Sequence, residues 1–137
     1  MKPITQTKVS SEDGSVSGNC FRACIASILE IDIDSIPAFE DMKGGEWHMP
    51  FFKFLSENGY EFHGTGRFDN EFHDELFKTY EGVDGYIIVN GTSPRKWVTR
   101  GHSVVYKNGV MVHDPHPSRE GLVDLRDYYM IEKRKDV

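Results

Sequence analysis

Three residues of this chain have side chains that can together carry out acyl transfer. Cys20 opens a stretch with the apolar periodicity of a helix, His102 opens a strand-like stretch, and Asp114 follows a predicted hairpin turn. A thiol nucleophile needs a base within hydrogen-bonding reach, and that base needs a partner that fixes its tautomer. We therefore interpret the three residues as nucleophile, general base and orienting carboxylate.

The position of Cys20 favours a reactive thiol. The apolar residues that follow it at spacings of three and four are typical of a buried helical face, and Asn19 stands where an N-cap residue belongs. We therefore expect Cys20 in the first turn of a helix over residues 20–30. The N-terminal end of a helix carries about half a positive charge, which stabilises a thiolate and lowers the pKa of the thiol.

The spacing between His102 and Asp114 predicts a hairpin that brings them together. Residues 102–107 and 110–112 are strand-like, and Asn108-Gly109 between them is a strong signal for a two-residue turn. A tight turn places Asp114 near the antiparallel partner of His102, where its carboxylate can accept the imidazole N–H. This register selects His102 among the six histidines of the chain.

Less specific interpretations of these residues stay open. A cysteine on an apolar helix face is most often a small core residue, which suits Cys24 one turn further on. A zinc site would draw on thiols and imidazoles: Cys20 and Cys24 with His102 and either His113 or His116. Against zinc, His102 and His113 lie on different expected strands, and the chain has no Cys-x-x-Cys pair. We expect no metal and no cofactor.

The elements that must position these groups indicate an α+β fold. Helical patterns dominate the first half of the chain: residues 20–30, 46–58 and 70–80. Strand patterns are a weak one over residues 4–9, which would carry Gln6, then 60–63, 85–90, 102–107, 110–112 and one within 128–133. Helices followed by antiparallel strands predict N-terminal helices packed on one face of a C-terminal sheet.

Length and composition restrict the class of protein. A chain of 137 residues suits a single domain over residues 1–137. The net charge is -6 and no Lys/Arg block is interleaved with aromatic residues, so we expect no nucleic-acid partner. No apolar run reaches the ~18 residues of a membrane span, and residues 1–8 lack the apolar segment of a secretory signal. We expect a cytoplasmic protein with free thiols and no membrane partner.

The motifs around these residues resemble those of the papain-like cysteine peptidases. They are Gly-Asn-Cys20-Phe-Arg-Ala-Cys24, Gly-His102-Ser-Val-Val and His-Asp114-Pro. They are most similar to the bacteriocin-processing (C39-type) peptidases, and closer still to small bacterial and phage proteins that share Ser93-Pro94-Arg95 and the string from His113 to Ser118. The resemblance covers most of the chain. It implies a papain-like (C39-like) fold with Cys20 as nucleophile, His102 as general base and acid, Asp114 as orienting residue, and a buried Cys24.

The resemblance also implies an oxyanion-hole donor upstream of the nucleophile. Such peptidases use a Gln before the Cys, together with the backbone N–H of the Cys, and Gln6 fits that order. Residues 10–18 separate Gln6 from Cys20 by more than the family pattern. Asn19, or a backbone N–H alone, is the alternative donor. Losing one such donor typically costs about 3 kcal/mol of transition-state stabilisation.

These observations together predict an acyl-transfer enzyme, most simply a cysteine peptidase or amide hydrolase. Its expected substrate is a peptide or an amide, and a host protein is one alternative. We expect its cleft between the first helix and the sheet, with walls at residues 44–50 and 91–100. Trp47, Arg95 and Trp97 are expected to bind substrate, and the cations of the second wall suit an acidic or C-terminal carboxylate group. Two alternatives stay open: a transferase that passes the thioester to an amine, and a non-catalytic binding or host-interaction module.

Overall fold

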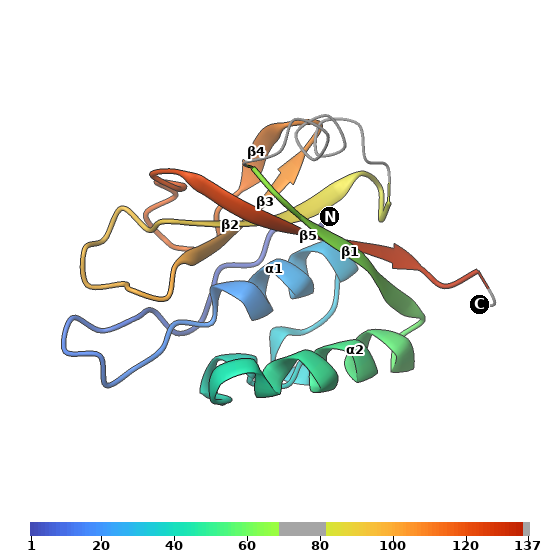
Figure 1. Cartoon of the computed structure of the whole chain (residues 1–137), viewed down its shortest axis with the longest axis horizontal. Coiled ribbons are helices and arrows are strands. Elements are labelled where there is room, and N and C mark those ends of the chain that lie inside the picture. The colour runs from blue at the N-terminus through green and yellow to red at the C-terminus, as the bar shows by residue number, and fades with distance from the viewer. Residues whose placement is uncertain (69–81, 136–137) are drawn as a thin grey trace.

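The computed structural model describes residues 1–68 and 82–135, in which two α-helices lie against one face of a five-stranded antiparallel sheet (Figure 1). The helices are α1 (Cys20–Leu29) and α2 (His48–Glu57). The strands are β1 (Tyr60–Arg67), β2 (Tyr86–Gly91), β3 (His102–Lys107), β4 (Val110–His113) and β5 (Leu125–Lys133). The short 3₁₀ helices η1 (Ile33–Ser35), η2 (Phe39–Asp41) and η3 (Gly44–Trp47) link α1 to α2. The expected α+β class is confirmed.

Strand β5 lies inside the sheet although it comes last in the chain, because the spatial order is β1-β5-β2-β3-β4. The β2–β3 ladder ends with His102 opposite Gly91. Helix α1 packs across β2 and β3, and α2 packs on β1. The end of the sheet that carries His102 and the start of α1 both lie on the left in Figure 1. This packing is what brings the two halves of the predicted site together.

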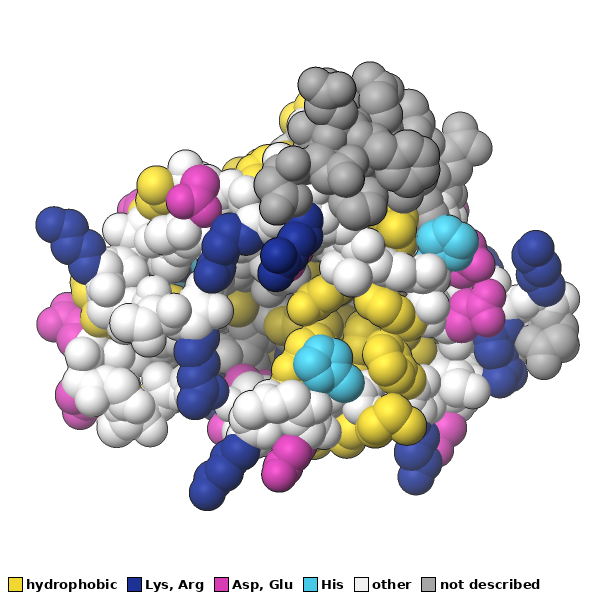
Figure 2. All heavy atoms as spheres, viewed as in Figure 1, with side chains coloured by type: hydrophobic (Ala, Val, Ile, Leu, Met, Phe, Trp, Pro, Cys, Tyr) yellow, Lys and Arg dark blue, Asp and Glu magenta, His cyan; other side chains and the backbone are white. Residues whose placement is uncertain are grey.

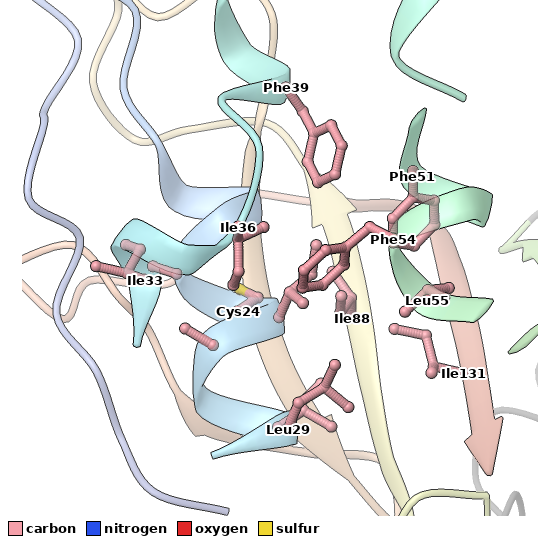
Figure 3. Packing of buried hydrophobic residues seen from close by; sticks show 14 of the residues in the cluster. Cys24, Leu29, Ile33, Ile36, Phe39, Phe51, Phe54, Leu55, Ile88 and Ile131 are labelled. Atoms are coloured by element: carbon pink, nitrogen blue, oxygen red, sulfur yellow. The ribbon is translucent and has the colours of Figure 1, made fainter. Parts of the chain in front are cut away.

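The main hydrophobic core fills the space between the two helices and the sheet (Figure 3). The residues labelled in that view are Cys24, Leu29, Ile33, Ile36, Phe39, Phe51, Phe54, Leu55, Ile88 and Ile131. Burying one large apolar side chain contributes about 1.5–3 kcal/mol. Cys24 is fully buried among them, so its predicted place in the core is confirmed. The core therefore fixes α1, and with it the start of the helix, against the sheet.

The helices begin and end close to the expected positions. α1 ends at Leu29, one residue early, because Glu30 adopts left-handed backbone angles with φ 57°. Residues 44–47 form the 3₁₀ helix η3 rather than the first turn of α2, which begins at His48. The second predicted helix is thus shorter than its sequence pattern indicated.

The strands also differ from the prediction mainly at their ends. β1 continues to Arg67 and β5 begins at Leu125, so both are longer than predicted, whereas β3 has the expected bounds. Asn108-Gly109 adopts φ 53° and 80°, the left-handed angles of a two-residue hairpin turn, as predicted. The helix predicted over residues 70–80 lies outside the described residues.

The predicted edge strand over residues 4–9 is wrong. This segment forms no strand, because its hydrogen bonds go to several separate parts of the chain: α1, Asn19, and the residues at the end of β4 and just beyond it. Ile4 N–H donates to Ser27 Oγ of α1 (3.0 Å), and Gln6 N–H donates to Pro115 O beyond β4 (2.9 Å). His113 Nε2–H donates to Ile4 O (2.8 Å). The segment therefore fills the seam between α1 and the residues after β4.

Over residues 1–68 and 82–135, no helix combines the length and apolar character needed to span a membrane.

Candidate active site

Cys20 is the first residue of α1, as predicted, and it is half-buried. Asn19 occupies the N-cap position, as predicted, but its side chain makes no capping hydrogen bond. Asn19 Oδ1 instead accepts the N–H groups of Thr7 (3.1 Å) and Lys8 (3.0 Å), and its Nδ2 donates to Thr7 Oγ1 (2.8 Å). The buried Asn19 therefore fastens residues 7–8 to the start of the helix, and one N–H of its amide is used by Thr7; its alternative role as oxyanion donor stays a prediction.

His102 lies between Cys20 and Asp114. Its Nε2–H donates to Asp114 Oδ1 at 2.7 Å, and its ring lies close enough to the Cys20 thiol for each group to shift the pKa of the other. Because Nε2 is committed to the carboxylate, Nδ1 is the nitrogen left for the sulfur. His102 and Asp114 are 4% and 2% exposed. The structure thus brings the three predicted residues together in the order thiol, imidazole, carboxylate.

Asp114 reaches His102 by a different route from the one predicted. The β3–β4 ladder contains a bulge and ends with Val105 opposite His113, three residues short of His102. The strand neighbour of His102 is Gly91 of β2. Asp114 therefore extends to the imidazole from the turn after β4, so the predicted contact is confirmed while the cross-strand pairing is wrong.

Backbone N–H groups hold the Asp114 carboxylate in place. His116 N–H donates to Oδ1 (2.9 Å), and Gly121 N–H donates to Oδ2 (2.8 Å). Burial raises the pKa of Asp114, but the hydrogen bonds from His102, His116 and Gly121 outweigh it. The pKa therefore lies below the ordinary 3.8. Asp114 stays ionised and can hold a protonated imidazole.

The electrostatics of the pair favour a thiolate beside an imidazolium. Burial raises the pKa of Cys20, but hydrogen bonds from His102 and Ser103 and the charge of His102 lower it below the ordinary 9.0. Burial lowers the pKa of His102, but Asp114 and Cys20 raise it from 6.5 to about 9. Both shifts therefore favour the state in which the proton resides on His102 and the sulfur carries the negative charge.

Gln6 lies in the wall of the cleft that contains Cys20. Its Nε2 donates one hydrogen bond to Lys8 O (2.7 Å), which leaves its second N–H. A Cβ at position 18 would lie 3.1 Å from Nε2, so Gly18 makes room for this amide two residues before Cys20. Asn19 N–H donates to Lys8 O (3.1 Å) and closes the base of the loop over residues 10–18. The extra loop therefore leaves Gln6 close to the nucleophile.

A cleft of about 640 Å³ opens over Cys20 and His102. Trp47 forms part of one wall, with its ring stacked on His48 at 3.9 Å between centroids and edge-on to Phe21 at 5.3 Å. The loop over residues 10–18 also lines the cleft and was not expected there. Of the wall predicted at residues 44–50, only Gly44 and Trp47 line the cleft.

The opposite wall is the segment between β2 and β3, as predicted. Arg95 and Trp97 both line the cleft. Trp97 is 41% exposed, and its Nε1–H donates to Ser10 O (3.0 Å), so it ties this wall to the loop over residues 10–18. Arg95 Nη1 donates to Ser118 Oγ (3.2 Å). The three residues predicted to bind substrate thus all line the same cleft.

A second hollow of about 470 Å³ adjoins the cleft and shares Trp47, Asp127 and Tyr129 with it. Its other lining residues lie mainly on α2 and β1: His48, Phe51, Phe52, Phe62, Thr65, Gly66 and Arg67. Figure 2 shows hydrophobic side chains gathered in a hollow on this face. The cleft is therefore bordered on one side by an apolar surface.

Sequence reasoning missed a polar row on the cleft floor. Ser103 Oγ donates to Asn90 Oδ1 (2.6 Å), and Asn90 Nδ2 donates to Asp127 Oδ1 (2.8 Å). All three residues line the cleft, and Ser103 lowers the pKa of Cys20. The available signal was a Ser and an Asn, each directly beside apolar residues of an expected strand.

The described residues provide no set of ligands for the zinc site considered above. No cluster of three or more His, Cys, Asp or Glu side chains suited to a metal occurs in the part of the chain that the structure describes. Both cysteines are free thiols, and Cys24 is buried in the core. His113 is committed to Ile4 O. The side chains near Cys20 are instead arranged for proton transfer.

No protein-family model matches this chain, and searches of curated proteins and of solved structures find no match either. The resemblance of the three motifs to the papain-like peptidases therefore receives neither support nor contradiction from these comparisons.

Proposed function

We propose that this protein is a cysteine-dependent acyl-transfer enzyme, most simply a peptidase or amide hydrolase. The observation that carries the proposal is the alignment of Cys20, His102 and Asp114 in an open cleft, with a 2.7 Å hydrogen bond between the imidazole and the carboxylate. The lowered pKa of Cys20 and the raised pKa of His102 are those that a thiol nucleophile and its base require.

In the first step, the Cys20 thiolate attacks the carbonyl carbon of a peptide or amide bond, and the carbonyl oxygen becomes an oxyanion. The backbone N–H of Cys20 can donate a hydrogen bond to this oxyanion, because the N–H of a first helical residue has no acceptor within its helix. The second N–H of Gln6 Nε2 is the other proposed donor. Two donors aimed at the oxyanion lower the barrier for this step.

In the second step, the imidazolium of His102 donates its proton to the leaving nitrogen. The carbon–nitrogen bond breaks, the amine departs, and a thioester remains on Cys20. Neutral His102 then takes a proton from water, whose oxygen attacks the thioester carbon. The carbon–sulfur bond breaks, the carboxylic acid leaves, and Cys20 returns as the thiolate beside protonated His102. Asp114 keeps the ring in one orientation throughout, with Nε2–H on the carboxylate and Nδ1 toward the sulfur.

The finer proposal for the fold is that of a papain-like (C39-like) peptidase. It is supported by a nucleophile at the start of a helix that packs on an antiparallel sheet. It is supported also by a base at the start of one strand and an orienting residue just after the next. The buried Cys24, one turn beyond the nucleophile, agrees with the same motif.

The test is the rate at which iodoacetamide alkylates Cys20, measured from acid to alkaline pH by mass spectrometry. In the wild type, alkylation should continue well below pH 9.0, the ordinary pKa of a thiol. In His102→Ala the profile should move to higher pH, whereas His48→Ala, which changes an exposed histidine on α2, should leave it in place.

An ordinary thiol profile in the wild type, unaltered in His102→Ala, would overturn the proposal and favour a non-catalytic binding module. Cys20→Ser should abolish fast labelling, because Cys24 is fully buried. Adding a primary amine during turnover of a substrate separates hydrolysis from transfer, since only a transferase forms the amide of that amine.

A further inference from the structure

Arg95, Ser118 and His116 form a hydrogen-bonded cluster beside the catalytic histidine. Arg95 Nη1 donates to Ser118 Oγ (3.2 Å), and Ser118 Oγ and His116 Nδ1 are 2.9 Å apart. The rings of His116 and His102 meet edge to face with 6.1 Å between centroids. Arg95 and His116 line the cleft over Cys20. None of these three residues has a role in the proposed acyl transfer itself.

The hydrogen bonds fix the tautomer of His116. Ser118 N–H donates to His116 Nδ1 (3.0 Å), and a backbone N–H can only donate, so Nδ1 is an acceptor. The proton of the neutral ring therefore resides on Nε2. Burial lowers the pKa of His116, and the charges of Arg95 and His102 lower it further, so the ring stays neutral at physiological pH. His116 thus presents one fixed N–H donor.

The charges at this end of the cleft favour an anion. Among the described residues, the Arg95 guanidinium forms no ion pair with a carboxylate and donates to the neutral hydroxyl of Ser118. The positive charges of Arg95 and His102 each lower the pKa of His116 more than the carboxylates of Asp114 and Glu120 each raise it. The local field is therefore dominated by positive charge.

The carboxylates that line the cleft are already engaged elsewhere. Glu40 accepts from Lys8 Nζ (2.7 Å) and Arg22 Nη2 (2.8 Å), and Asp127 accepts from Asn90 Nδ2. Neither carboxylate forms an ion pair with Arg95. The guanidinium of Arg95 has five N–H groups in a planar fork that matches a carboxylate, and one of them is used by Ser118.

We propose that Arg95, His116 and Ser118 form a carboxylate subsite on the leaving-group side of the cleft. The inference rests on the proposed function, in which His102 protonates the leaving nitrogen. A group packed against His102 is then close to that nitrogen. In an amino acid, a single carbon separates the amine from the carboxylate. The expected substrate is therefore a peptide or N-acyl amino acid, cleaved so that an amino acid with a free α-carboxylate leaves.

The test compares alkylation of Cys20 by iodoacetate and by iodoacetamide, two reagents of similar size that differ in charge. Their rate ratio, iodoacetate over iodoacetamide, should fall about fivefold in Arg95→Ala, as expected for loss of a partly exposed charge pair. It should fall less in His116→Phe, which keeps a ring against His102 but removes the donor. Lys96→Ala removes the same charge from an exposed neighbour outside the cleft lining and should leave the ratio unchanged.

An equal fall of the ratio in Arg95→Ala and Lys96→Ala, or no fall in either, would overturn the subsite. The two proposals fail separately, because the absolute iodoacetamide rate reports on the pairing of Cys20 with His102. An iodoacetamide rate that continues well below pH 9.0 and shifts to higher pH in His102→Ala, together with an unchanged ratio in Arg95→Ala, removes only the subsite.

The source of the carboxylate is tested by protection of Cys20 from iodoacetamide. L-alanine offers an α-carboxylate, isoglutamine offers only a side-chain carboxylate, and L-alaninamide offers neither. Protection by L-alanine, lost in Arg95→Ala, supports release of a C-terminal amino acid. Protection by isoglutamine alone would overturn that assignment in favour of an acidic residue after the scissile bond, and equal protection by all three would overturn the subsite.

Discussion

Cys20, His102 and Asp114 acquire their chemistry from their immediate partners rather than from residue type alone. Cys24 is the same residue type as Cys20 and lies one turn away on the same helix. Burial and the nearby charges of Cys20 and Asp114 raise its pKa well above 9.0, whereas a histidine partner brings the pKa of Cys20 below that value. Only the first of the two cysteines is therefore suited to be a nucleophile.

At the residue scale, Gln6→Ala separates oxyanion stabilisation from thiol reactivity. If Gln6 Nε2 donates to the oxyanion, the variant should lower kcat for peptide or amide hydrolysis by about 10²–10³-fold. Alkylation of Cys20 by iodoacetamide should be unchanged, because that reaction forms no oxyanion. A parallel loss of both activities would show that Gln6 acts on the position of Cys20, and normal turnover would remove Gln6 from the oxyanion hole.

Helices, strands and loops position these residues through contacts that local sequence patterns predict only in part. The helix start at Cys20 and the hairpin turn at Asn108-Gly109 follow from periodicity and turn chemistry, and both were predicted. The bulge in the β3–β4 ladder depends on pairing between strands, so nothing in the spacing revealed it. The N-terminal segment has weak alternation but takes its conformation from α1 and from Pro115, which no local pattern contains.

At the element scale, Asn19 should be important for stability, because it is 1% exposed and makes three side-chain hydrogen bonds to residues 7–8. Asn19→Ala leaves two backbone N–H groups without their acceptor. It should lower the free energy of unfolding by about 2–4 kcal/mol. Urea denaturation followed by circular dichroism measures the change.

Asn58→Ala is the matched control for Asn19→Ala. Asn58 is exposed, and its side chain donates a single hydrogen bond, to Phe54 O (2.8 Å), so about 1 kcal/mol of stability should be lost. Equal effects of the two substitutions would contradict the fastening role of Asn19.

At the scale of the whole molecule, the cleft arises where three distant parts of the chain meet. The loop over residues 10–18, the segment from η2 to η3, and the segment between β2 and β3 surround Cys20. The sequence allowed the last wall to be predicted together with Trp47 and Arg95. The first loop was interpreted only as an insertion, because its return to Lys8 and its bond to Trp97 depend on the folded arrangement.

The cleft is also asymmetric as a whole, and this bears on substrate choice. Its side near α2 adjoins the apolar hollow lined by Phe51, Phe52 and Phe62, whereas its side near β3 carries Arg95 and His116. A substrate with an apolar part and an anionic leaving group would match both sides. Strand spacing and composition gave no means of placing these two surfaces relative to Cys20.

The central claim is that pairing with the imidazolium of His102 makes the thiol of Cys20 more acidic than an ordinary thiol. Its most direct test is a pH titration of thiolate ultraviolet absorbance, taken as the difference between wild type and Cys20→Ser. The midpoint should lie below 9.0 in the wild type and should rise in His102→Ala, because the charge and hydrogen bond of His102 that lower the pKa are lost. A wild-type midpoint at or above 9.0, unmoved in His102→Ala, would contradict the claim.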